Sequence, residues 1–374
     1  MKSLKGLGHL TLNLLFVAAL LVPLVTMGTS VAAAAGGSAG AVYVLTNEAN
    51  GNQVAVFNRS ATGTLSSAGA FATGGLGSGG GLGSQGALAL DRSNHWLFAV
   101  NAGSNEISVF AVRPDGLALT DKVASGGIQP ISLTAHDHLL YVLNAGGSGN
   151  ITGFTVDPRG RLRPLPGSTR SLSNSGVGAA PGPAQIQFSP DGESLVVTEK
   201  ATSLIDVYEV ERGLAKGPKT HKSAGATPFG FDFDTRGTLV VSEAAGSALS
   251  SYRVSEGGFH VVSASVPDGQ GAACWVVITR NGKYAYTANA HSGSISSYRL
   301  SRNGRLSLLD SRAGVTGDNS SPIDIALSND SQYLYQLASG TRAIVAFQVQ
   351  PDGSLVSISS IGGLPASAVG LAAR

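Results

Sequence analysis

Cysteine is almost absent from the sequence, and neither sign of charge is in excess. The single cysteine, Cys274, excludes a disulfide framework, a cysteine-based metal site and a lipid-modified cysteine behind an N-terminal leader. Only 13% of the residues are charged, and the net charge of +2 falls to zero without Lys2 and Lys5. The chain therefore lacks the net basic charge that attracts nucleic acid.

Glycine and apolar residues are abundant, with 51 glycines and 43% hydrophobic residues, a composition that favours strands and turns over helices. At the N-terminus, Lys2 and Lys5 precede the apolar run 10–25 and the small residues 32–35. This order predicts a secretory signal peptide over residues 1–35, cleaved near Ala34 or Ala35. The alternative is an uncleaved membrane anchor, because the run approaches the roughly 20 residues that span a bilayer.

Residues 182–210 contain the pattern that the rest of the chain repeats. A short apolar strand ends at Phe188, a tight turn follows, a second strand ends at Glu199 and an alternating third strand ends at Val210. A turn such as 114–116 and a fourth strand follow in the other copies. Period-2 alternation predicts antiparallel strands with one buried face. Six complete copies recur at roughly 43 to 55 residues, as propeller blades do.

The seventh copy is divided between the two ends of the chain. Residues 42–45 and 54–57 form a second and a third strand without a first, whereas residues 365–371 form a first strand with nothing after it. Pairing the two ends closes a ring without open sheet edges. We therefore expect an all-β, seven-bladed β-propeller of four-stranded blades over residues 36–374, closed by the C-terminal strand.

Three hairpins carry a resemblance to a known family. SPDGESLVVTE (189–199), RNGKYAYTAN (280–289) and SNDSQYLYQLA (328–338), each after an apolar first strand, resemble the lactonase family of seven-bladed propellers, which includes 6-phosphogluconolactonase and the fungal carboxymuconate cyclases. The hairpin ending at Leu140–Asn144 is also similar to surface-layer-type propellers with a Tyr-Val-Thr-Asn signature. The resemblance covers essentially residues 41–374 and implies a lactone hydrolase.

The family's first-strand pattern, Pro-Arg-His-Ile-x-Phe, implies an arginine and a histidine that face the central channel. The matching stretch Pro183–Phe188 has Ala184 and Gln185 in their place. In the other copies we place the histidine position at Ala87, Pro130, Gly230, Trp275, Asp324 and Ala368, none of which is a histidine. Lactone opening needs a base for water or a cation for the oxyanion, and acid–base help is worth about 10²–10⁴-fold. The sequence thus argues against an unmodified lactonase.

Polar residues gather where the second strands end, at the face that also carries long glycine- and serine-rich loops. This ring comprises Asn47, Asn101, Asn144, Glu199, Glu243 and Asn289, is interrupted at Ala338, and is followed by Glu48 and Lys200 one residue further on. Such residues often hydrogen-bond only loop backbone. The functional alternative is a paired-carboxylate site of Glu199 and Glu243, or a cation site with the asparagine amides.

The candidate residues follow from these patterns. The catalytic candidates are Glu199, Glu243, Gln185 and His291, and the ligand-binding candidates are Glu48, Asn101, Asn144, Lys200, Trp275, Asn289 and Asp324. We interpret His95, His136, His138, His221 and His260 as surface residues, Trp275 as a channel plug rather than a ligand platform, and Cys274 as a buried thiol. Gly75–Gly80 fits GxGxxG but leads into a strand, so we interpret it as a loop.

Two functions of different class remain open at this point. One is an exported hydrolase of sugar lactones, and the other is an exported, non-catalytic propeller that binds a glycan, a cell-wall component or a protein. We expect a monomer that is secreted, needs no cofactor and has no protein-ligated metal, with a divalent cation in the central channel as an open alternative. We expect no nucleic-acid partner, and contact with the membrane only through an uncleaved leader.

Overall fold

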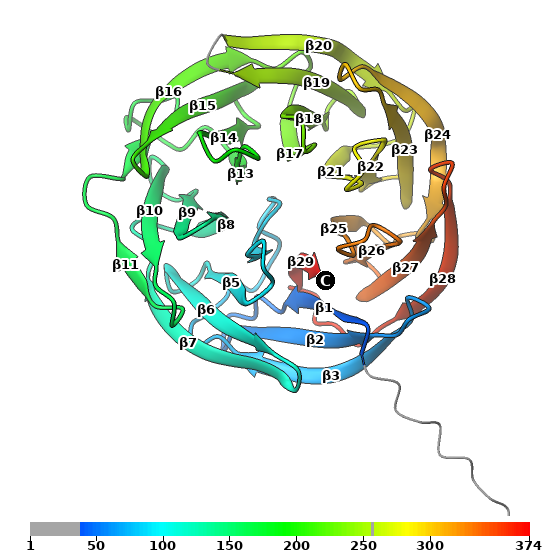
Figure 1. Ribbon diagram of the computed structural model, residues 1–374, viewed down its shortest axis with the longest axis horizontal. Coiled ribbons are helices and arrows are strands. Elements are labelled where there is room, and N and C mark those ends of the chain that lie inside the picture. The colour runs from blue at the N-terminus through cyan, green and yellow to red at the C-terminus, as the bar shows by residue number, and fades with distance from the viewer. Residues whose placement is uncertain (1–37, 256–257) are drawn as a thin grey trace, which may run out of the picture. The chain divides into compact units, whose positions relative to one another are not determined.

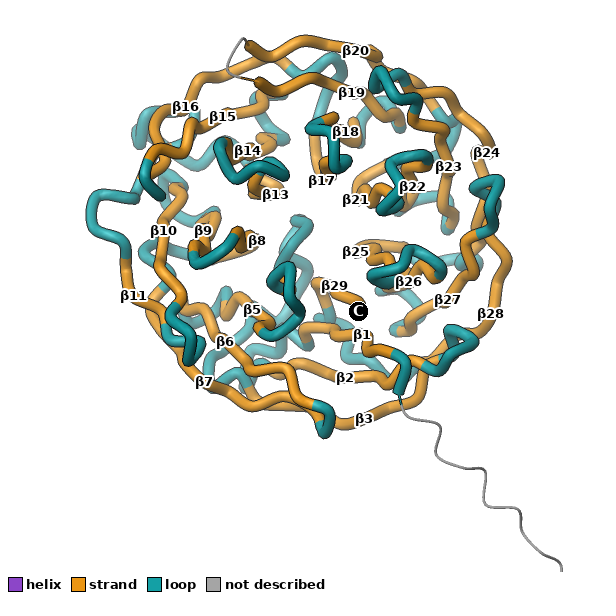
Figure 2. The backbone as a smooth tube through the Cα atoms, viewed as in Figure 1, coloured by secondary structure: helices purple, strands orange, loops and turns teal. Residues whose placement is uncertain are grey.

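The computed structural model describes residues 38–255 and 258–374, which belong to one compact unit. These residues form strands and loops and no helix (Figure 2). In this part of the chain there is accordingly no helix with the length and hydropathy needed to cross a bilayer. The predicted signal peptide, residues 1–35, lies outside the described residues, and its boundary stays a prediction.

Seven separate antiparallel sheets stand in a ring, each with its first strand toward the centre (Figure 1). We name these blades A to G in chain order. Blade A contains β29 (Val369–Ala373), β1 (Gly40–Leu45), β2 (Gln53–Arg59) and β3 (Leu65–Ala72). Blade B contains β4 (Leu88–Leu90), β5 (Trp96–Asn101), β6 (Glu106–Arg113) and β7 (Gly116–Ala124). Blade C contains β8 (Pro130–His136), β9 (Leu139–Asn144), β10 (Asn150–Val156) and a divided outer strand, β11 (Leu162–Pro164) and β12 (Arg170–Ser171).

The remaining four blades repeat the arrangement without interruption. Blade D contains β13 (Pro183–Phe188), β14 (Ser194–Glu199), β15 (Leu204–Glu211) and β16 (Leu214–Lys222). Blade E contains β17 (Pro228–Phe233), β18 (Thr238–Glu243), β19 (Ala248–Ser255) and β20 (Gly258–Pro267). Blade F contains β21 (Ala273–Ile278), β22 (Tyr284–Asn289), β23 (Ser294–Leu300) and β24 (Leu306–Val315). Blade G contains β25 (Pro322–Leu327), β26 (Tyr333–Ala338), β27 (Ala343–Val349) and β28 (Leu355–Ile361). The predicted seven-bladed propeller is confirmed.

The two ends of the chain close the ring, as the divided seventh copy predicts. Strand β29 pairs antiparallel with β1, with Ala373 opposite Val42 and Leu371 opposite Val44. The Arg374 side chain donates a 2.9 Å hydrogen bond to the hydroxyl of Tyr43. Blade A therefore has four strands like the others, and no first-strand edge is left open.

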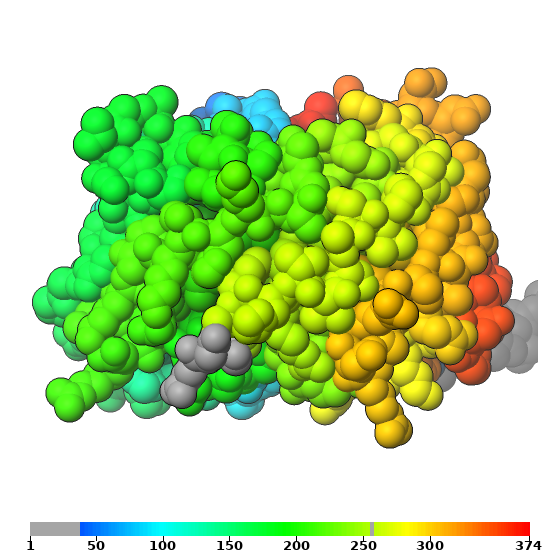
Figure 3. All heavy atoms as spheres, turned by 90° about the horizontal axis from the view of Figure 1, so that it is seen from above, coloured from blue at the N-terminus to red at the C-terminus, as the bar shows by residue number. Residues whose placement is uncertain are grey.

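Tyrosines of the second strands tie blades C, F and G to the blades that follow them. The hydroxyls of Tyr141, Tyr286 and Tyr335 donate at 2.9–3.0 Å to glycine carbonyls in the outer turn of the following blade. In blade G this acceptor is Gly353, whose φ of +89° suits glycine, and a Cβ there would lie 2.5 Å from the ring of Tyr284. The recurrent outer-turn glycines are thus required both by the turn and by the tyrosine packed against it. The flank of blades D, E and F is seen in Figure 3, and on it residues of blades D and E, among them His221 and Phe259, line a cavity of about 410 Å³.

The ring has two chemically different faces. The hairpin face carries the turns between first and second strands and between third and fourth strands. The loop face carries the turns after the second strands and the connections between blades. The propeller begins at the hairpin face, because Gly40 of β1 pairs with Arg59 at the end of β2, next to the outer turn of blade A.

Candidate functional site

A cavity of about 480 Å³ lies at the centre of the ring and opens at the hairpin face. The innermost strands of all seven blades line it, and the turn residues Arg92, Pro190 and Thr235 reach its mouth. A volume of this order accommodates a small molecule. The sequence patterns pointed instead to the loop face, where the second strands end.

The channel is closed toward the loop face by the segment that connects blades A and B. This segment, between β3 and β4, runs into the middle of the ring (Figure 1). The Gln85 side chain crosses to β21, donating to the carbonyl of Val276 at 2.8 Å and accepting from its N–H at 2.9 Å. The indole N–H of Trp275 donates to the carbonyl of Ser84 at 2.9 Å. We call Ser84, Gln85 and Trp275 the channel plug, which agrees with the interpretation of Trp275 from the sequence.

Strand pairing identifies the residues that face the channel at the level of Gln185, where the family has its histidine. They are Ala87, Ser132, Gln185, Gly230, Trp275, Asp324 and Gly370. Two positions assigned from the sequence were wrong. In blade C, Pro130 pairs with Asn144 in the same way that Pro183 pairs with Glu199 in blade D, so Pro130 corresponds to Pro183 and Ser132 corresponds to Gln185. In blade A, Leu371 takes the place of Ile186, so Gly370 and not Ala368 stands here. Apolar alternation looks the same after a shift of two residues, which explains both slips.

Asp324 is the one residue at this level with an ionisable side chain. Its side chain lines the cavity although the residue is only 3% exposed. Oδ2 accepts a 2.7 Å hydrogen bond from the N–H of Gly370, whereas Oδ1 receives none from the described residues. Burial raises the pKa of the carboxyl to about 7, partly offset by the backbone N–H donors. Near neutral pH, Asp324 is therefore present in both protonation states.

Asp232 is a second cavity carboxyl, which the sequence interpretation missed. Oδ1 accepts hydrogen bonds from the side chain of Gln187 at 3.1 Å and from the N–H of Phe233 at 2.8 Å, and Oδ2 accepts from the N–H of Ile278 at 2.8 Å. Burial raises its pKa to about 6, and the hydrogen bonds limit the rise. Alternation in Phe231–Phe233 places Asp232 on the channel face, a signal that the search for histidines overlooked.

Glutamine amides connect the inner strands across the cavity wall. The Gln185 amide donates to Gln187 at 3.0 Å and to the carbonyl of Phe231 at 2.9 Å, while its oxygen accepts from the N–H of Phe231 at 2.7 Å. The Gln185 side chain thus links β13 of blade D to the backbone of β17 in blade E. Its predicted catalytic role stays a prediction, but the structure does bring it to the same cavity as Asp324.

Two basic side chains stand on the cavity wall near its mouth. Arg92 is the one lysine or arginine in the lining and donates to the carbonyl of Pro190 at 2.6 Å. His136 was expected on the surface, yet its side chain is only 13% exposed, because the ring packs against Phe188 at 5.6 Å and against the Gly192 turn. His136 therefore belongs to the cavity wall.

Glu199 and Asp206 form a buried acidic pair in blade D. Glu199 accepts from the N–H of Ser173 at 3.0 Å and from the hydroxyls of Ser173 and Thr202, each at 2.6 Å. The pKa of Asp206 is raised, first by burial and second by the neighbouring Glu199. Both residues are fully buried, so Glu199 contacts its own blade and loop rather than the cavity.

The other members of the predicted ring have local partners at the loop face. Glu243 accepts a hydrogen bond from Ser265, Asn101 bonds to Asn52, Thr73 and Ser108, Asn144 to Asn150, and Asn289 to Ser294 and Ser296. All four are fully buried. In blade A the ring position is Thr46, because its N–H continues the ladder beyond Leu45 by donating to the carbonyl of Gln53 at 2.8 Å, and Asn47 turns away with a φ of +50°. No hydrogen bond among the described residues joins Glu199 to Glu243.

The remaining predicted residues lie on the loop face or in the plug. His291 follows β22 and, with Asp318 and Ser320, lines an open hollow of about 780 Å³. Glu48 precedes the plug segment, and its carbonyl accepts from the N–H of Gly77 at 2.9 Å. The Lys200 ammonium lies 4.9 Å from the ring of Phe229 and donates to the carbonyl of Gly83, and burial lowers its pKa. A role for any of them in binding or catalysis stays a prediction.

Within residues 38–255 and 258–374, no group of three or more histidine, cysteine, aspartate or glutamate side chains is arranged to hold a metal ion. Cys274 is 6% exposed, and burial raises the pKa of its thiol to about 12. A thiol with this pKa is protonated at neutral pH and unreactive.

The fold and the cavity define a closed propeller with a small-molecule site on its axis. The model of the family described as lactonase, seven-bladed beta-propeller, matches residues 37–170 and 240–322, which is more than half of the chain. The chain therefore belongs to the lactonase family of seven-bladed propellers. The unmatched residues 171–239 include β13, where Ala184 and Gln185 replace the expected pair.

Solved structures with this fold come from several bacteria. The chain is 19% identical to a candidate 6-phosphogluconolactonase from Bacteroides fragilis, with a TM-score of 0.68 over 90% of this chain and 98% of that one. It is 16% identical to the periplasmic gluconolactonase of Pseudomonas aeruginosa, with a TM-score of 0.68 over 88% of this chain and 98% of that one. These similarities support the fold. No curated protein sequence matches the chain.

Proposed function

We propose that this propeller hydrolyses a small sugar lactone in the central cavity, with Asp324 as the general base. The observation that carries the proposal is the buried Asp324 carboxyl, whose Oδ1 receives no hydrogen bond from the described residues in a cavity open to small molecules. A base is most effective when its pKa lies near the working pH, and burial brings that of Asp324 to about 7.

The proposed reaction is an ordinary ester hydrolysis. Asp324 takes a proton from a water molecule while the water oxygen bonds to the lactone carbonyl carbon. The tetrahedral intermediate then breaks the bond between that carbon and the ring oxygen, and the ring oxygen receives the proton. Because the family's Arg-His pair is absent, the acceleration from Asp324 alone is about 10²–10⁴-fold. Arg92 at the mouth is suited to hold the polar end of the substrate.

The family and the names of two structural relatives support a lactone as the substrate. The Bacteroides fragilis protein is a candidate 6-phosphogluconolactonase, and the Pseudomonas aeruginosa protein is a periplasmic gluconolactonase. Export is a separate part of the proposal, and it depends on the charged and apolar pattern of residues 1–35.

The test is hydrolysis of glucono-δ-lactone by the purified protein, followed by pH-stat with the spontaneous rate subtracted. We expect Asp324→Asn to lower kcat/KM by about 10²-fold or more. The matched control, Asp318→Asn on the exposed loop face, should stay within about twofold of wild type. The wild-type kcat/KM should rise as the pH increases through about 7, because only the ionised carboxyl accepts a proton.

The same assay separates the two faces. If Glu199→Gln and Glu243→Gln lowered kcat/KM while Asp324→Asn left it unchanged, the catalytic site would lie at the loop face. Absence of turnover in the wild type would overturn the proposal that the protein is a lactone hydrolase. It would favour the second function, a propeller that binds a glycan or a cell-surface partner without reaction. The missing Arg-His pair is the observation that favours this second function.

A further inference from the structure

The hairpin face of blade F is strongly basic. Between Asp268 and Asp310 the sequence contains no aspartate or glutamate. Five basic residues occupy the turns and strand ends at this face, and we name them the blade F basic cluster: Arg280, Lys283, Arg299, Arg302 and Arg305. All five are exposed.

The charges of the blade F basic cluster are not neutralised within the described residues. No member lies within ion-pair distance of a carboxylate there. In blade D, by contrast, exposed lysines are paired with glutamates: Lys219 with Glu209 at 2.6 Å, and Lys216 with Glu211. Glu256, in the outer turn of blade E, lies outside the described residues.

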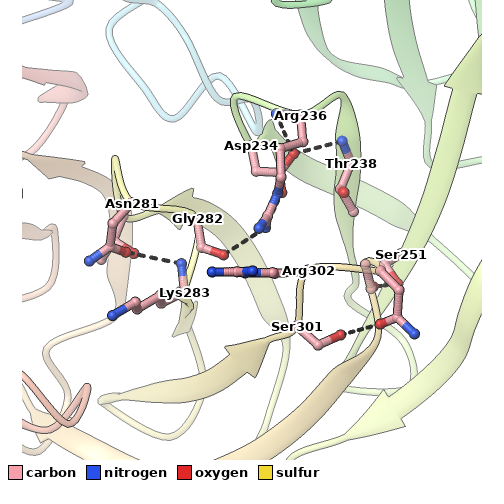
Figure 4. Close-up of polar contacts among 12 residues, drawn as sticks. Asp234, Arg236, Thr238, Ser251, Asn281, Gly282, Lys283, Ser301 and Arg302 are labelled. Atoms are coloured by element: carbon pink, nitrogen blue, oxygen red, sulfur yellow. Dashed lines mark hydrogen bonds and ion pairs between the residues drawn. The ribbon is translucent and has the colours of Figure 1, made fainter.

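The turn between Arg280 and Lys283 is held in place by a neighbouring arginine. Arg236 of blade E donates to Oδ2 of Asp234 at 2.6 and 2.8 Å and to the carbonyl of Gly282 at 2.9 Å. Asp234 is therefore already paired with Arg236. Lys283 and Arg302 extend from two turns of blade F, and neither has an ion-pair partner among the described residues (Figure 4).

The propeller also begins at this face. The N–H of Ala39 donates to the carbonyl of Arg59 at 2.9 Å, next to the outer turn of blade A. In sequence, thirteen residues, 26–38, separate this point from the apolar run 10–25, a span of at most about 50 Å when extended. As an uncleaved anchor, the run would hold the hairpin face within reach of a bilayer; after cleavage, the attraction would come from the basic cluster alone.

We propose that the hairpin face docks on an anionic lipid bilayer through the blade F basic cluster. Each lysine or arginine near an anionic surface strengthens binding about fivefold, and the attraction falls off within a Debye length. Unpaired, exposed cations on firmly held turns supply this attraction without a cost for breaking internal ion pairs. The proposal is independent of lactone hydrolysis.

The test is co-sedimentation of the full chain with two kinds of vesicle, pure phosphatidylcholine and phosphatidylcholine with about one quarter phosphatidylglycerol. The variant combines Lys283→Ala, Arg302→Ala and Arg305→Ala. The matched control combines Arg113→Ala, Arg159→Ala and Arg161→Ala, which remove equal charge from exposed residues at the hairpin face of blades B and C. Thermal unfolding of both variants verifies that they remain folded.

We expect the wild type to prefer the anionic vesicles and to lose that preference in high salt. The blade F variant should bind them about 10²-fold more weakly, and the control variant within about threefold of wild type. Equal binding of the wild type to both vesicles, or equal losses in the two variants, would overturn the proposal. Binding to heparin or duplex DNA without preference for anionic vesicles would assign the cluster to a soluble polyanion instead.

Discussion

The two ends of the central channel are built from the same seven strands but differ in chemistry. At the loop face, Gln85 and Trp275 fill the channel. Gln85 hydrogen-bonds to Val276, the residue after Trp275, and Trp275 hydrogen-bonds to Ser84, the residue before Gln85. At the hairpin face, the same strands surround an open cavity in which Asp324 keeps a carboxylate oxygen without a described donor. A propeller ring therefore fixes the position of a site, while one interblade segment decides which face is open.

The difference also explains why polar residues at the loop face are poor indicators of function. Asn101 and Glu199 are fully buried, and each accepts or donates several hydrogen bonds within its own blade and loop. Buried polar groups of this kind are usually structural because every missing bond would cost about 1–3 kcal/mol. Of the cavity carboxyls, Asp324 has one described donor and Asp232 has three, and burial raises the pKa of both. A raised pKa in a cleft is typical of functional groups.

The largest expected effect is the removal of the indole from the plug. Trp275→Ala should lower the free energy of unfolding by about 3–5 kcal/mol, because a side chain that is 6% exposed and packed 4.9 Å from the ring of Phe229 leaves a cavity. Urea denaturation measures the change, and Trp275→Phe should lose clearly less. A loss below about 1 kcal/mol would show that the plug does not contribute packing energy.

A smaller effect is expected at the polar part of the plug. Gln85→Leu should lower the free energy of unfolding by about 1–3 kcal/mol, since the N–H and the carbonyl of Val276 both lose their partner. The matched control, Gln332→Leu in an exposed turn, should change it by less than about 0.5 kcal/mol. Equal effects of the two substitutions would argue that Gln85 is not a structural crosslink.

The Asp324 carboxyl at the open end should make the stability of the protein depend on pH. Asp324 has a pKa of 3.8 when unfolded and about 7 when folded, so the folded state binds the proton more tightly. Its contribution to stability is complete below pH 3.8 and is lost as the pH rises through about 7. Asp324→Asn should therefore make the slope of unfolding free energy between these values less negative, by up to about 1.4 kcal/mol per pH unit. Asp318→Asn should leave the slope unchanged.

The smallest effect is expected at Glu48, which does not line the cavity. Glu48→Gln should change the free energy of unfolding by less than about 0.5 kcal/mol and lactone turnover by less than about twofold. Urea denaturation and the pH-stat assay measure both quantities. A large loss of turnover would restore the loop face as the binding site.

The local sequence was sufficient for the strands and for their number. Alternating stretches such as Ile205–Tyr208, the recurrent turns and the divided seventh copy predicted the seven closed blades that the structure contains. These features depend on interactions within one blade or between consecutive residues. Their period is thus visible in the chain itself.

The charge distribution could not be inferred from the whole-chain total. A net charge near zero is compatible with a basic blade F and an ion-paired blade D, because positive and negative charges in different blades cancel in the total. The stretch without acidic residues between Asp268 and Asp310 is visible in the sequence, but the turns of the structure show that Arg280 and Arg302 stand on the same face of blade F without ion-pair partners among the described residues.

The sequence by itself determined the propeller, its seven blades and its closure, because strand alternation and turn chemistry are local properties. The tertiary structure decided which face of the channel is open, since Gln85 meets Val276 across 191 residues of chain. It also decided that Asp324 and Asp232 share a cavity, whereas Glu199 is held within its blade. Contacts between distant blades depend on ring closure and loop path, and neither leaves a periodic signal in the sequence.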